Sequence, residues 1–69
     1  MEPMSIQRQL LLTYSWWQGV AFRAEGHAIR AARQQDARAL RCWANTHWHA
    51  HDAMEEISDQ IRALEEVTP

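Results

Sequence analysis

The second half of the chain carries an apolar pattern that a single long helix would place along one side. Its positions alternate steps of three and four residues, and the members are Leu40, Trp43, His47, Ala50, Met54, Ile57, Ile61 and Leu64. Because an α-helix turns once every 3.6 residues, these steps align the side chains in one seam, in which only His47 is polar. Asp36 precedes the pattern and is a suitable N-cap. The spacing predicts a helix over about residues 37–66.

The first half of the chain repeats this spacing in a second seam. Its members are Leu10, Tyr14, Trp17, Ala21, Ala24, Ala28 and Ala31. Gly19 and Gly26 each weaken a helix by roughly 1 kcal/mol relative to alanine, so a kink or break near Gly26 stays open as an alternative. The spacing predicts one helix over about residues 5–33, with Arg33 to Asp36 forming the turn.

Folding the chain back at this turn pairs residues whose numbers sum to about 71. Ala31 then faces Leu40, and Ala21 faces Ala50, so small residues lie opposite large ones or each other near the turn. This complementarity lets two helices approach closely and fill the seam. The sequence therefore predicts an all-α fold, in which residues 1–69 form a single antiparallel two-helix hairpin.

The first helix has more apolar surface than one seam requires. Leu12, Trp16 and Val20 form a stripe on one flank, and the other flank carries Leu11, Phe22 and Ile29. A helix that is apolar on several faces is normally buried on several faces. We expect two hairpins to pair as a dimeric four-helix bundle, or part of the surplus to bind a different protein. The predicted dimer core consists of Leu12, Trp16, Val20 and Phe22.

The outer face of the second helix is a candidate partner-binding site. Trp48 lies one residue past the seam, where a polar residue would be expected, and an exposed tryptophan is a good interface anchor. The alternative is that Trp48 packs at the edge of the dimer. The predicted outer-face site consists of Trp48, His49, Asp52 and Glu56.

Charge is segregated along the hairpin. Arginines gather near the turn and form a second, basic candidate patch of Arg30, Arg33, Arg38 and Arg41, whereas carboxylates dominate residues 52–66. Both groups could simply be solvated faces. Nucleic acid is a less favoured partner because the chain has a net charge of -2 and no lysine. The acidic helix could instead mimic a phosphate backbone.

A metal site and an active site are weakly supported. His47, His51 and Glu55 are spaced four residues apart, as an i, i+4 metal chelate requires, but His47 belongs to the seam and no matching ligand group occurs in the first helix. The alternative is a histidine satisfied by Thr13, Tyr14 or a backbone group. No nucleophile stands beside a base and no phosphate-binding glycine loop is present. We expect no bound metal, no cofactor and no enzymatic activity.

The N-terminal residues and the hydropathy of the chain bear on where in the cell the protein is located. No stretch approaches the roughly 18 consecutive apolar residues of a membrane span, and the first ten residues lack a secretory signal pattern. The single cysteine, Cys42, cannot form an internal disulfide. We expect a cytoplasmic protein without a membrane partner.

Two short aromatic elements resemble those of a known class of small proteins. They are the pair Trp16 and Trp17 in the first helix, and Ala39, Leu40 and Trp43 early in the second helix. The chain resembles the small helical proteins with which bacteriophages inhibit host proteins, of the quorum-sensing anti-activator or anti-CRISPR type. The resemblance implies a dimeric inhibitor in the host cytoplasm that blocks a transcription regulator or a CRISPR-Cas complex. It transfers no partner-binding residue. The alternative function is a small dimeric regulator that contacts nucleic acid through its arginine-rich turn.

Overall fold

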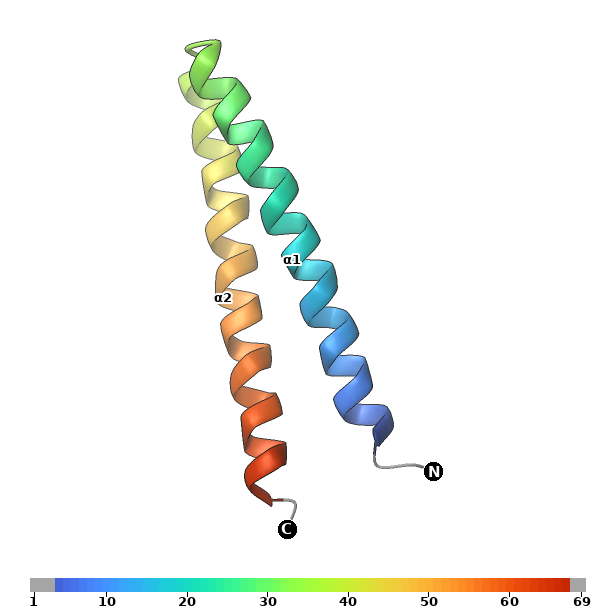
Figure 1. Cartoon of the computed structure of the whole chain (residues 1–69). Helices are drawn as coiled ribbons and strands as arrows, with labels where there is room; N and C mark the ends of the chain where they lie inside the picture. The colour runs from blue at the N-terminus through green and yellow to red at the C-terminus, as the bar shows by residue number, and fades with distance from the viewer. Residues whose placement is uncertain (1–3, 68–69) are drawn as a thin grey trace.

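The computed structural model describes residues 4–67, and within them the chain forms two helices and no strand. α1 spans Met4–Arg33 and α2 spans Ala37–Val67, and the two helices run antiparallel along a molecule of 52 × 17 × 12 Å (Figure 1). The predicted all-α hairpin is confirmed, with each helix one residue longer than expected at its outer end. α1 is continuous through Gly26, so the alternative of a break there is wrong.

The turn is closed by a Schellman motif followed at once by an N-cap. Gln35 adopts a left-handed conformation with φ of 57°, and its N–H donates to the Ala32 carbonyl at 3.1 Å. The next N–H, of Asp36, donates to the Ala31 carbonyl at 2.9 Å. The Asp36 carboxylate then accepts a hydrogen bond from the Ala39 N–H at 3.0 Å, which confirms the predicted cap of α2. These bonds satisfy backbone groups that the two helix ends would otherwise leave open.

Replacing Gln35 with glycine is expected to stabilise the hairpin by about 1 kcal/mol, because a Cβ in the left-handed region carries a steric cost of that order. The free energy of unfolding in urea, followed by circular dichroism, measures the gain. Gln34→Gly is the matched control, since the neighbouring Gln34 has no positive φ. A Gln35→Gly protein no more stable than the parent would contradict the conformation described here.

The core is narrow and rich in alanine. Its buried side chains are Ala21, Ala24, Ala31, Ala50, Met54 and Ile57. Ala50 has no exposed surface, and it lies in one buried cluster with Ala21 and Met54. The predicted opposition of Ala21 and Ala50 is therefore confirmed. Small residues allow close approach near the turn, and the helices diverge toward the two termini (Figure 1).

The polar member of the seam is satisfied by the opposite helix. His47 is half-buried, and its Nδ1 lies 3.3 Å from the carbonyl oxygen of Ala21. A protonated Nδ1 donates to this carbonyl, so the backbone is the partner among the alternatives left open by the sequence. Thr13 instead donates its hydroxyl to the Gln9 carbonyl in its own helix. The contact ties α2 to α1.

Candidate functional site

Both flanks of α1 expose large apolar side chains. Leu12 is 62% exposed and Trp16 is 59% exposed, whereas Val20 of the same stripe packs against the buried cluster. Phe22, 78% exposed, follows Val20 by two residues, which is about 200° around a helix. Phe22 therefore faces the opposite flank. Of the predicted dimer core, three residues share one surface and Phe22 belongs to another.

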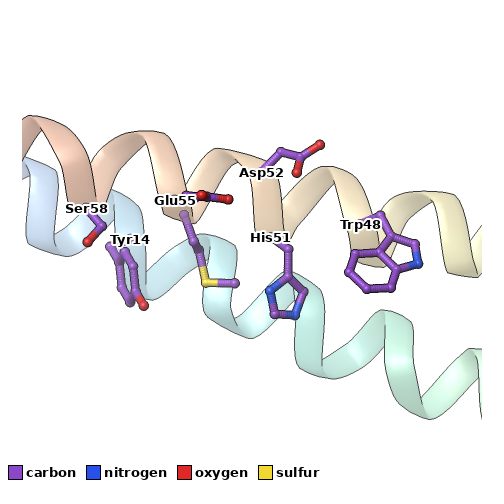
Figure 2. Close-up of a pocket in the computed structure, with 7 residues that line it drawn as sticks. Tyr14, Trp48, His51, Asp52, Glu55 and Ser58 are labelled. Carbon is purple, nitrogen blue, oxygen red and sulfur yellow. The ribbon is translucent and has the colours of Figure 1, made fainter.

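A groove beside Trp48 forms the first candidate surface on α2. Trp48 is 64% exposed, and its ring contacts those of His47 and His51, with centroids 5.5 and 5.8 Å away. The groove has a volume of about 360 Å³ and reaches across to Tyr14 of α1. Figure 2 shows Trp48 and His51 on one side of α2, with Asp52 on the outer edge of that helix. We call this hollow the Trp48 groove; its lining residues are Tyr14, Trp48, His51, Asp52, Met54, Glu55 and Ser58.

A second groove lies on the other flank of α2. His49 meets Trp17 edge to face with ring centroids 5.4 Å apart, and Trp17 meets Trp16 in the same way at 4.7 Å. Trp17, His49, Asp52 and Glu56 all line this groove. The predicted outer-face site is thus divided: Trp48 lines one groove, His49 and Glu56 line the other, and Asp52 borders both.

Every histidine of the chain lies against a tryptophan. Besides the three on α2, His27 stacks on Trp43 with centroids 4.3 Å apart and planes 21° apart. This pairing was not predicted from the sequence, although residue numbers that sum to about 71 place His27 close to Trp43. Tyr14 and Ser58, which the same rule places opposite one another, were also not predicted as groove residues. These contacts make the middle of the hairpin an aromatic band.

The basic patch lies at the turn end, and all four of its arginines are exposed. Arg30 and Arg33 occupy the last turn of α1, where a cation is favourable to the helix dipole. Arg38 and Arg41 lie near the beginning of α2, where the dipole disfavours them. Within residues 4–67 the only ion pair joins Arg62 and Asp59 at 3.6 Å, so these arginines have no carboxylate partner in that part of the chain.

The arrangement of the histidines within residues 4–67 decides which of them could share a metal ion. The rings of His47 and His51 approach to 4.6 Å between centroids. In the part of the chain that the structure describes, no group of three histidine, cysteine or carboxylate side chains has an arrangement that could hold a metal ion. Cys42 is exposed and free. Neither described helix has a stretch long and apolar enough to cross a membrane.

Comparison with protein-family models, curated proteins and solved structures found no match to this chain. Its function is therefore argued from its own surfaces. Two shallow grooves lined by aromatic rings and carboxylates, and two apolar flanks, are features suited to contacting another macromolecule.

Proposed function

We propose that this chain is a non-enzymatic protein-binding module that acts as a homodimer and occludes a surface of its partner. One observation carries the proposal: a hairpin only 17 by 12 Å across leaves large apolar side chains exposed on both flanks of α1 and at Trp48. Large exposed apolar patches on soluble proteins usually mark binding sites. The flank of α1 that carries Leu12 and Trp16 and the surface around Trp48 support two kinds of partner.

The stripe of Leu12, Trp16 and Val20 is the better candidate for self-association. Its residues follow one another at steps of four, so they form a continuous ridge along α1. Val20 packs against the buried cluster, so the ridge is continuous with the core at this position. Pairing two such ridges gives the four-helix bundle that is the common solution for helices with two apolar faces.

The Trp48 groove is then the candidate surface for a different protein. Trp48 projects from the middle of α2 and is bordered by carboxylates, so it combines an aromatic anchor with an acidic rim. The resemblance to phage-encoded inhibitors supports a host transcription regulator or CRISPR-Cas complex as the target. Binding would block that target by steric occlusion or by mimicry of an acidic ligand.

One observation favours a second candidate function. Arg38 and Arg41 lie where the dipole of α2 disfavours them, and helix stability therefore does not account for their position. A basic turn of this kind could contact phosphates of nucleic acid. Retention on DNA that falls steeply with salt, without any protein partner, would favour this function over the first.

Capture of a partner from a bacterial lysate tests the proposed function. The parent protein is expected to retain one host protein that a Trp48→Ala, Asp52→Arg variant loses, because truncating a central aromatic anchor costs about 2 kcal/mol or more. A captured protein must also lose its activity when the purified hairpin is added. Without that inhibition, occlusion is wrong.

A matched control separates the groove from general surface changes. Val67→Ala with Glu66→Arg makes the matching charge reversal and a smaller truncation of an apolar side chain at the end of α2, where Val67 is exposed and lies outside the Trp48 groove. This control is expected to retain the partner. If it loses the partner as completely as the Trp48 variant does, the acidic end of α2, and not the groove, is the binding surface.

A further inference from the structure

The Trp48 groove combines two aromatic rings with two carboxylates. Tyr14 of α1 and Trp48 of α2 both line it, and the buried Met54 contributes an apolar lining. Asp52 and Glu55 follow Trp48 by four and seven residues, which places all three on one face of the helix. Both carboxylates are exposed. Aromatic rings and carboxylates therefore line the same groove, and Figure 2 shows Asp52 on the outer edge of α2, on the side of the helix away from His51.

Within residues 4–67 no cationic side chain pairs with the carboxylates of this groove, because the single ion pair lies one turn further along α2, between Asp59 and Arg62. His51 also lines the groove, and its ring contacts those of Trp48 and His47. An anionic ligand such as a phosphate would be repelled here, whereas a cation would meet two unpaired carboxylates.

We infer that the Trp48 groove receives an arginine side chain presented by the partner protein. A guanidinium stacks on an indole face and donates its planar array of N–H groups to carboxylates at the same time. The ammonium group of lysine is not planar, so it cannot stack on the indole and at the same time donate a planar array of hydrogen bonds to the carboxylates. The inference rests on the proposed function and deepens it, since it gives the partner a basic, arginine-presenting surface.

Binding of a short peptide tests the inference without knowledge of the partner. The probe is N-acetyl-Gly-Arg-Gly-amide, and the matched probe carries citrulline, which is similar in shape and neutral. The indole Nε1–H signal of Trp48, assigned by its absence in Trp48→Phe, is followed by ¹H–¹⁵N NMR at pH 8. The arginine peptide is expected to shift this signal with a dissociation constant on the order of millimolar, and the citrulline peptide to bind about tenfold more weakly.

Paired charge variants test the role of the carboxylates. Asp52→Asn with Glu55→Gln is expected to weaken the arginine peptide about tenfold. Glu65→Gln with Glu66→Gln makes the same change in net charge at the end of α2 and is expected to leave binding within twofold. Equal shifts from both peptides, or equal losses from both variants, would overturn the inference.

Two further outcomes are informative. If the Trp48 signal shifts with protein concentration alone, and Arg38→Gln with Arg41→Gln abolishes that shift, an arginine of a second copy fills the groove and the inference about a partner is wrong. If a partner is captured from lysate while neither peptide binds, the inference fails and the proposed function stands. If the arginine peptide binds selectively but no partner is captured, the proposed function fails, and only the selectivity of the groove for arginine is supported.

Discussion

A protein with both Leu12 and Trp16 replaced by aspartate is expected to remain monomeric at concentrations where the proposed dimer of the parent protein forms. Burying each of these side chains contributes about 1.5–3 kcal/mol, and in a twofold dimer every change occurs twice. The dissociation constant of the dimer should therefore rise by at least about a thousandfold. Both side chains are more than half exposed in the hairpin, so the hairpin itself should keep its helices.

Sedimentation equilibrium over a wide concentration range measures this effect, and circular dichroism reports whether the helices persist. The control is Leu11→Asp with Phe22→Asp, which places the same charges on the opposite flank of α1. If the control dissociates and the Leu12, Trp16 variant does not, the dimer uses the flank that carries Phe22. A parent protein that is monomeric at every concentration would refute the dimer itself.

Replacing Ala50 with leucine is expected to destabilise the hairpin by about 1–3 kcal/mol, because added methylenes in a tightly packed seam force the helices apart. Ala50 has no exposed surface and lies against Ala21 in the buried cluster. In a chain of 69 residues this loss is a large share of the total stability. Unfolding in urea at a fixed protein concentration measures the change.

Ala63→Leu provides the control for this substitution. Ala63 is exposed on α2, so the same change there should alter the free energy of unfolding by no more than about 0.5 kcal/mol. If the Ala50→Leu protein proves as stable as the parent, the helices are not closely packed at that level. The alanine seam would then have no role in fixing how near the helices lie.

The two helices and their capping could be predicted from the sequence because both depend on local spacing. The seam from Leu40 to Leu64 fixes one side of α2, and Asp36 stands where a cap is needed. The left-handed conformation of Gln35 could not be predicted in the same way. Glycine is the usual residue at that position, and a glutamine gives no indication of a left-handed conformation.

The candidate site was predicted less completely because it belongs to two helices at once. Spacing along α2 places Trp48 and His49 about 100° apart, and a single outer face can include both. Only the position of α1 decides that Tyr14 completes a groove with Trp48 while Trp17 completes another with His49. Side chains from an opposite helix depend on register and on how far the helices diverge, which residue spacing does not determine.

Because α1 and α2 diverge toward the termini, the two ends of the hairpin differ in how easily they open. Near the turn, alanines hold the two backbones close, and capping bonds tie the helix ends together. At the other end the helices separate, and Ile6 and Val67 are more than half exposed (Figure 1). Local opening costs least where few apolar contacts must be broken. We therefore expect the hairpin to open first where α1 and α2 diverge and last at its turn, with the Trp48 groove between these two regions.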